Sequence, residues 1–96
     1  MAIMITVTPQ AAAWYKKELH LKDGDHVKFF GKIYGARDGF SFTIGTQEPT
    51  RPELMINVEG INFYVEKNDA WFFDDFTLLV DLDDHYKEPT FITQKK

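Results

Sequence analysis

The 96-residue sequence contains no cysteine, and this absence excludes several classes of site. Without thiolates the chain cannot form a disulfide scaffold, use a cysteine nucleophile, or hold zinc or an iron–sulfur cluster through cysteine ligands. Basic residues are also in the minority, since 11 Lys and Arg stand against 15 Asp and Glu, giving a net charge of −4. Nucleic acid is not expected as a main partner, because phosphate binding needs clustered basic side chains.

Long hydrophobic runs are missing as well. No apolar stretch approaches the roughly 18 residues of a membrane span, and residues 1–5 lack the basic segment of a signal peptide and meet Pro9 too early. We therefore expect a cytoplasmic protein with no membrane partner. The 44% hydrophobic content, with nine Phe, four Tyr and two Trp, is enough for one packed core. Residues 1–96 are accordingly expected to form a single domain.

The negative charge is concentrated late in the sequence. Residues 1–37 carry six basic and three acidic side chains, whereas residues 38–96 carry five and twelve. This asymmetry indicates either a negative face for a basic partner or a solvated edge that keeps an aromatic-rich domain soluble. The late acidic residues are Asp69, Asp74, Asp75, Asp81, Asp83, Asp84 and Glu88.

The sequence opens with the pattern of a strand followed by a helix. Residues 3–7 favour a short strand, and Thr8 and Pro9 suit the N-cap and first position of a helix that runs to about Leu19. Apolar residues recur along it at helical spacing, which predicts a buried stripe. The stripe comprises Ala12, Tyr15 and Leu19, broadened by Ala11 and Trp14.

Two β-hairpins are predicted next. Residues 26–34 and 40–44 alternate apolar and polar side chains, and the glycines of residues 35–39 permit a tight reversal between them. Residues 46–53 contain two prolines and are expected to form a loop. The second hairpin turns at Glu59-Gly60 and pairs Val58 with Ile61, Ile56 with Phe63 and Asn57 with Asn62.

The remaining residues predict a short helix and one more strand. Residues 67–73 favour a short helix or turn that packs Trp71 and Phe72, and residues 77–83 favour the last strand. The tail after His85 is expected to fray.

The aromatic residues divide into a core set and a less buried set. The expected core rings are Phe29, Phe40, Phe42, Phe63 and Phe72. Four further rings fall on the less buried faces of the predicted elements, namely Trp14, Phe30, Tyr34 and Tyr64. Two interpretations stay open for them: an exposed patch that binds a partner or closes a homodimer, or a second layer that covers them.

Candidate catalytic and metal sites are weak. The sequence shows no nucleophile beside a base, His20 suits a helix C-terminus, and His26 is expected to be exposed at the start of a strand. The best metal candidate gathers carboxylates and an imidazole within five residues, without the glycine and glutamate spacing of an EF-hand. It comprises Asp81, Asp83, Asp84 and His85. We therefore expect neither an enzyme nor a bound cofactor.

Four stretches together resemble one family. They are the opening Ile-Thr-Val-Thr-Pro-Gln-Ala-Ala of residues 5–12, the glycine hairpin of residues 29–42, and residues 58–65 and 71–78. The chain resembles the HesB-like domain family, which includes the IscA-type iron–sulfur carriers and a cysteine-lacking YneR-like branch. The resemblance implies an α+β fold, with a mixed, mainly antiparallel β architecture, an N-terminal helix and a second short helix.

The family's carriers hold their metal or cluster through one cysteine in the glycine hairpin and a pair near the C-terminus. Here the hairpin tip holds Ala36, Arg37 and Asp38, and residues 86–91 contain no cysteine where the pair would lie. The resemblance therefore implies the family's scaffold without its cluster ligands.

We expect a non-enzymatic domain that binds a protein or a small ligand. If it has a recognition site, the hairpin tip is favoured: Tyr34 would stack, Arg37 would hold a carboxylate or phosphate, and Asp38 would accept hydrogen bonds. Solvation of a tight turn would also explain Arg37 and Asp38. The alternative function is an accessory role in iron–sulfur cluster biosynthesis, with iron bound by carboxylates and His85 or by a partner's cysteines.

Overall fold

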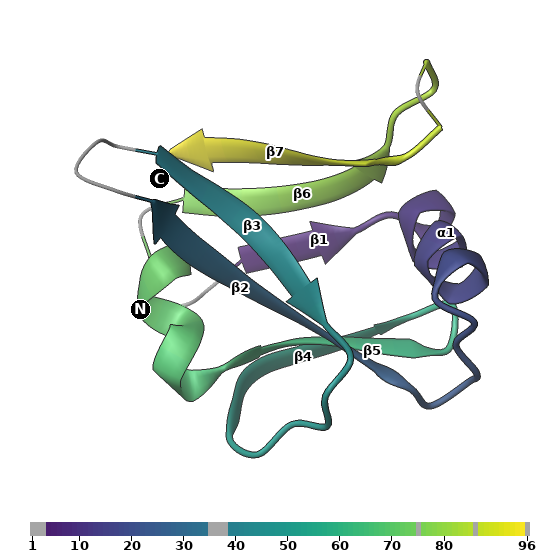
Figure 1. Cartoon of the computed structure of the whole chain (residues 1–96), viewed down its shortest axis with the longest axis horizontal. Coiled ribbons are helices and arrows are strands. Elements are labelled where there is room, and N and C mark those ends of the chain that lie inside the picture. Colours follow the sequence, from purple (N-terminus) through teal and green to yellow (C-terminus); the bar gives the residue numbers. More distant parts are fainter. Residues whose placement is uncertain (1–3, 35–38, 75, 86, 96) are drawn as a thin grey trace.

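The computed structural model describes residues 4–34, 39–74, 76–85 and 87–95, with residues 32–34 and 39–43 described by their backbone alone. Within these ranges, strands form two sheets and a helix lies at each end (Figure 1). The elements are β1 (Met4–Val7), α1 (Pro9–Glu18), β2 (His26–Tyr34), β3 (Gly39–Gly45), β4 (Pro52–Val58), β5 (Ile61–Glu66), the 3-10 helix η1 (Lys67–Phe73), β6 (Phe76–Leu82) and β7 (Pro89–Lys95).

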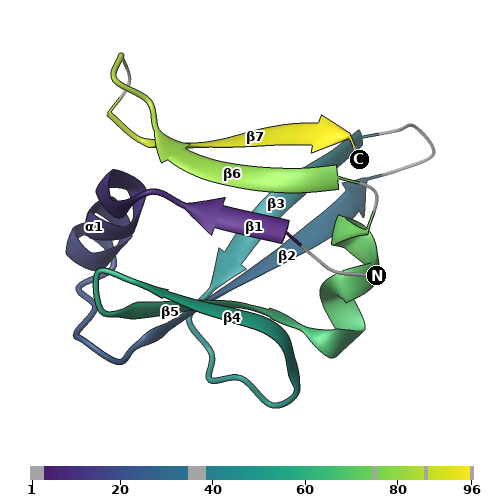
Figure 2. The same ribbon diagram turned by 180° about the vertical axis from the view of Figure 1, so that it is seen from behind.

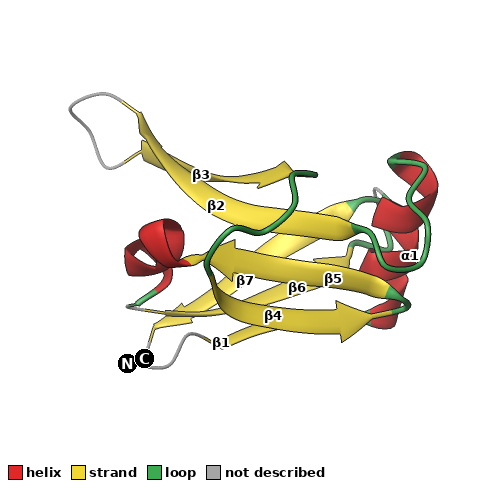
Figure 3. Cartoon of the chain, turned by 90° about the horizontal axis from the view of Figure 1, so that it is seen from below, coloured by secondary structure: helices red, strands yellow, loops and turns green. Residues whose placement is uncertain are grey.

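The two sheets are mixed. One has the strand order β1-β6-β7 and the other β3-β2-β5-β4. The pairs β1–β6 and β2–β5 are parallel, and the other three pairs are antiparallel. The edge strands β1 and β4 lie on the same side of the molecule, and the β2–β3 hairpin extends from the other (Figures 2 and 3). This arrangement confirms the expected α+β fold with mainly antiparallel strands.

The core lies between the two sheets and is rich in aromatic rings. Phe29 and Phe63 stack with ring centroids 5.6 Å apart and an interplanar angle of 8°, and Tyr15 of α1 packs edge-on against both. Burial raises the pKa of Tyr15 to about 12, so its hydroxyl stays protonated. The facing sheet contributes Ile5, Val7, Leu78 and Val80.

Thr8 joins the start of α1 to the end of β6. Its Oγ1 accepts a hydrogen bond from the Ala11 N–H at 3.2 Å and donates one to Asp81 Oδ1 at 2.9 Å. Its backbone N–H donates to the Val80 carbonyl at 3.0 Å. The predicted N-cap is confirmed, and it also fixes the helix on the sheet.

Replacing Thr8 with alanine is expected to lower the free energy of unfolding by about 1–2 kcal/mol, because it removes the cap and one of the two hydrogen bonds that Asp81 Oδ1 accepts. Thr8→Ser is the matched control, since serine keeps the hydroxyl and should cost much less. Urea unfolding followed by circular dichroism measures both variants. Equal losses in the two variants would contradict the role of the hydroxyl.

The second hairpin has the predicted register. Val58 pairs with Ile61, Ile56 with Phe63 and Asn57 with Asn62, and the Asn57 Nδ2 donates to Asn62 Oδ1 at 3.0 Å. Glu59 and Gly60 both have positive φ, 54° and 84°, as a tight two-residue turn requires.

Three expectations for single segments are wrong. The tail after His85 does not fray, because β7 pairs antiparallel with β6 from Pro89 to Lys95 and its proline stands at the first strand position, which tolerates the missing donor. Trp71 is 59% exposed rather than packed, although Phe72 beside it is partly buried. The loop predicted for residues 46–53 ends earlier, since β4 begins at Pro52 as an edge strand.

The rings expected to be less buried differ in how far they are exposed. Tyr64 is 1% exposed, so a covering layer is correct for this ring, whereas Trp14 and Phe30 are half-buried. The side chains of Phe40 and Phe42 lie outside the described part of the chain. None of the described helices is both long and apolar enough to span a membrane.

Candidate functional site

The predicted recognition site falls largely outside the described residues. Tyr34 is described by its backbone, which pairs with Gly39 across the hairpin, and Arg37 and Asp38 lie outside the described residues. The hairpin tip therefore stays a prediction.

The residues of the predicted metal candidate make separate hydrogen bonds with their own neighbours. Asp81 Oδ1 accepts from the Thr8 hydroxyl and from the Leu82 N–H at 2.8 Å, and Asp83 Oδ1 accepts from the His85 N–H at 2.7 Å. In the described ranges, no three His, Asp or Glu side chains gather closely enough to hold a metal ion. His20 is exposed after α1, and His26 is half-buried with its ring edge-on to Tyr64 at 6.0 Å.

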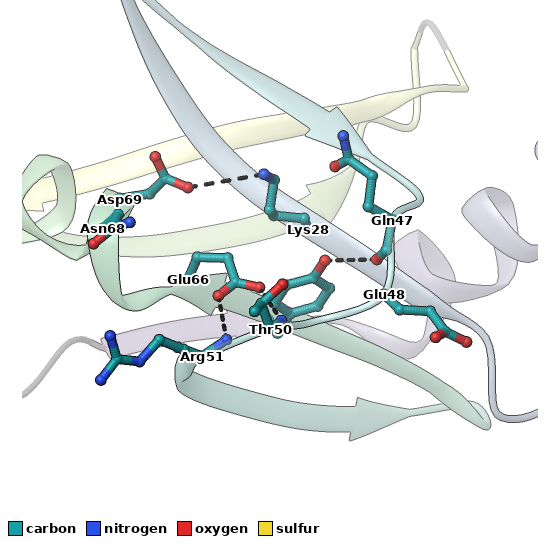
Figure 4. Close-up of a pocket in the computed structure, with 9 residues that line it drawn as sticks. Lys28, Gln47, Glu48, Thr50, Arg51, Glu66, Asn68 and Asp69 are labelled. Carbon is teal, nitrogen blue, oxygen red and sulfur yellow. Dashed lines mark hydrogen bonds and ion pairs between the residues drawn. The ribbon is translucent and has the colours of Figure 1, made fainter.

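A polar cavity of about 580 Å³ lies where the loop of residues 46–51 passes over β2 and β5 (Figure 4). Its lining comes from β2, this loop, β5 and η1. Lys28 lies on one side of it, with Nζ 3.9 Å from Asp69 Oδ2 and 4.8 Å above the Phe30 ring. Side chains of both charges therefore face the cavity.

Glu66, at the end of β5, holds the loop in place. Its carboxylate accepts hydrogen bonds from the backbone N–H of Thr50 at 2.7 Å and of Arg51 at 2.8 Å (Figure 4). The Lys67 N–H donates to the Arg51 carbonyl at 2.8 Å and adds a third connection. The Thr50 hydrogen bond, with help from Arg51 and the Lys28 charge and against desolvation, lowers the pKa of Glu66.

Tyr64 lies beneath the same loop. Its hydroxyl donates to the Gln47 carbonyl at 2.6 Å. Burial raises the pKa of Tyr64, and the negative charges of Glu66, Asp69 and Glu48 raise it further. At neutral pH Tyr64 therefore stays protonated and Glu66 stays ionised, so neither is poised for general acid–base catalysis. The two groups fix the loop, and the other lining side chains make the cavity charged.

Replacing Glu66 with glutamine should free the loop and lower the urea midpoint at neutral pH, because the amide cannot serve both N–H donors as a carboxylate does. The folded-state pKa of Glu66 is lowered, so its stabilisation is complete above the ordinary glutamate pKa, about 4.3, and is lost as the pH falls through the folded value. The difference in midpoint between the two proteins should therefore shrink in acid. Glu53→Gln, at an exposed position on β4, is the control, and an acid-independent difference for Glu66→Gln would refute this role.

The cavity was not predicted, because its lining residues are far apart along the chain. The sequence offers a proline-containing loop and a glutamate at a strand end, and neither indicates a cavity. The contact between the loop and Glu66 follows from the antiparallel pairing of β4 with β5, in which Pro52 lies opposite Glu66. The cavity also needs the parallel pairing of β2 with β5, which brings Lys28 beside Tyr64.

Comparison with known proteins places the chain among relatives of its own size. No family model matches it. It is 36% identical over 90 residues to the pyruvate dehydrogenase inhibitor of Bacillus subtilis, covering 91% of this chain and 95% of that protein. It is 30% identical over 98 residues to an uncharacterised protein of Staphylococcus aureus, covering 96% of this chain and all of the relative.

Among solved structures, Escherichia coli SufA, which is involved in the biosynthesis of iron–sulfur clusters, superposes with a TM-score of 0.68. The superposition covers 99% of this chain and 83% of SufA at 22% identity, so it shows a shared fold. The 36% identity along almost the full length of the Bacillus protein shows a closer relationship than the 22% identity to SufA. The chain thus belongs to one family with the Bacillus subtilis pyruvate dehydrogenase inhibitor, and it has the HesB-like fold expected from the sequence, which it shares with SufA.

Proposed function

We propose that this protein is a non-enzymatic regulator that works by binding another protein, and that its target is pyruvate dehydrogenase. The observation that carries the proposal is the 36% identity to an inhibitor of that enzyme over 95% of the inhibitor's length. A domain of this size and fold accounts for nearly the whole of that relative.

The chemistry of the chain supports binding over catalysis or cluster transfer. The sequence has no cysteine, so its own side chains offer no thiolate to iron. Two titratable groups of the polar cavity, Tyr64 and Glu66, hold a loop, with the pKa of Tyr64 raised and that of Glu66 lowered. These properties favour a protein that binds a partner without catalysing a reaction.

The test is a titration of purified pyruvate dehydrogenase, from the organism that makes this protein, with increasing amounts of the protein. The initial rate should fall saturably, and calorimetry should show binding over the same concentration range. A second NAD-reducing dehydrogenase in the same assay is the control and should keep its full rate. Full pyruvate dehydrogenase activity and no heat of binding at excess protein would refute the proposal.

We propose further that the hairpin tip contributes to the contact through Tyr34, Arg37 and Asp38. The support is chemical: a guanidinium suits a carboxylate or phosphate on a partner. Arg37→Ala should then weaken binding about tenfold, whereas Lys22→Ala, which removes an exposed positive charge elsewhere in the chain, should have little effect. Equal binding by wild type and Arg37→Ala would remove the tip from the interface.

The alternative, an accessory role in iron–sulfur cluster biosynthesis, draws on the SufA-like fold. It requires iron bound through carboxylates and His85 or through cysteines of a partner. Anaerobic titration with ferrous iron separates the two functions. Stoichiometric binding that is abolished by Asp83→Asn and His85→Ala would favour the alternative.

A further inference from the structure

An apolar notch of about 330 Å³ opens between α1, the end of β3 and the start of β7. Its size lies at the lower end of the range for ligand-binding clefts, which suits one inserted side chain better than a whole ligand. Five of its lining residues are aromatic or aliphatic and the sixth is a glutamate. They are Trp14, Tyr15, Ile44, Pro89, Phe91 and Glu88.

The wall of the notch is fixed by the core. Tyr15 is buried and packs edge-on against Trp14, with ring centroids 5.4 Å apart, as well as against Phe29 and Phe63. Phe91 packs edge-on against Phe29 at 6.2 Å. A partner would therefore contact aromatic side chains that are already held in place, so that binding loses little side-chain conformational entropy. This is typical of interface hot spots.

The rim of the notch is acidic. The turn between β6 and β7 lies at the same end of the molecule as α1 (Figures 1 and 2). Glu88 both lines the notch and closes the turn, because its carbonyl accepts from the Asp83 N–H at 2.8 Å. Residues 81–88 carry four carboxylates against one lysine, a formal charge of −3 with His85 neutral.

The other charges near the notch do not offset this rim. Lys17 and Glu18 stand one helical turn after Trp14 and are both exposed, so their charges cancel. Lys16 pairs with Asp23 on another side of α1. Apolar surface bordered by negative charge is complementary to a segment that carries both apolar and basic side chains.

We propose that this notch and the acidic β6–β7 turn form the docking surface for a basic segment of the protein partner. One apolar side chain of that segment enters the notch against Trp14 and Phe91, and flanking lysines or arginines face the turn. The inference rests on the proposed function for the identity of the partner, and it adds the face and the chemistry of contact.

The first arm of the test uses no enzyme. Two short synthetic peptides are compared, both with a central leucine and tryptophan, one flanked by lysines and the other by glutamates. The basic peptide should bind saturably and shift the backbone amide resonances of Trp14, Glu88 and Phe91, and the acidic peptide should not. Equal binding of both peptides, no binding, or shifts confined to another face would overturn the proposal.

The second arm uses pyruvate dehydrogenase. The double variant Asp84→Lys with Glu88→Lys should raise the half-inhibitory concentration at least about tenfold, and Trp14→Ala should do the same while its circular dichroism spectrum stays native. The matched control is Glu53→Lys with Glu59→Lys, which makes the same charge change at exposed positions in β4 and in the turn after it and should shift the value less than about twofold.

The two arms separate the two proposals. If the basic peptide binds in the notch but the wild-type protein leaves the enzyme unaffected, the proposed target is wrong and the docking surface stands. If the wild-type protein inhibits and the rim variants inhibit as well as the control variants, the function stands and the docking surface is overturned.

Discussion

Phe63→Ala is expected to lower the free energy of unfolding by about 3–5 kcal/mol, the largest loss of any single substitution considered. The ring is 1% exposed, stacks on Phe29 of the neighbouring strand β2 and meets Tyr15 edge-on at 5.9 Å, so it joins this sheet to α1. Removing it leaves a cavity at the point where these elements join. A domain of this size has about 5–15 kcal/mol of stability, so the variant should unfold at a much lower urea concentration.

Trp71→Ala is the matched control for Phe63→Ala. It also deletes an aromatic ring, but Trp71 is 59% exposed and its described ring contact is with Phe72. Its loss should stay below about 1 kcal/mol. Unfolding of the two variants in urea, followed by circular dichroism, would contradict this description of the core if Phe63→Ala cost no more than Trp71→Ala.

Gly31→Ala is expected to cost about 1–3 kcal/mol, although alanine normally suits a strand at least as well as glycine. A Cβ at this position of β2 would overlap the ring of Phe72, which packs on the glycine from η1. The ring must therefore move, and it is confined by Phe73 and Phe76, with centroids 5.3 and 6.1 Å away. Urea unfolding measures the loss.

A double-mutant cycle tests this cause. In a Phe72→Ala background the space above Gly31 is open, so adding Gly31→Ala should cost little, and the two losses should be far from additive. Gly45→Ala in β3 is the control glycine, because its Cβ would meet chiefly the flexible Gln47 side chain, at 2.8 Å from Oε1. Additive losses for Gly31 and Phe72 would show that the ring is not the cause.

The parts of the fold that depend on neighbouring residues were predicted well. The Thr8 cap needs residues 8–11 alone, and the second hairpin needs a turn at Glu59-Gly60 with alternating residues on each side. Both signals lie within a few residues, so the periodicity and the turn residues were sufficient.

The parts that depend on distant residues were not predicted. The tail was expected to fray because of Pro89, yet β7 completes a sheet by pairing with β6, and a proline at the first strand position does not prevent this. Phe72 against Gly31, and Lys28 beside Tyr64, join segments that the sequence does not show to be adjacent. The candidate site was missed for the same reason, since its residues come from β2, a loop, β5 and η1.

The fold shared with SufA also shows how little a fold says about chemistry. SufA and this chain share their architecture, whereas this sequence has no cysteine with which to bind a cluster. The chain has an aromatic-rich core between two sheets, and residues that pack on that core line the notch proposed as a docking surface.

The central claim, that the protein acts by protein contact alone, is tested most directly by comparing two preparations in the pyruvate dehydrogenase assay. One is dialysed against a chelator, and the other is treated anaerobically with ferrous iron and sulfide. The account predicts the same half-inhibitory concentration for both, within about twofold. Inhibition that appears only after the iron and sulfide treatment, or in neither preparation, would contradict it.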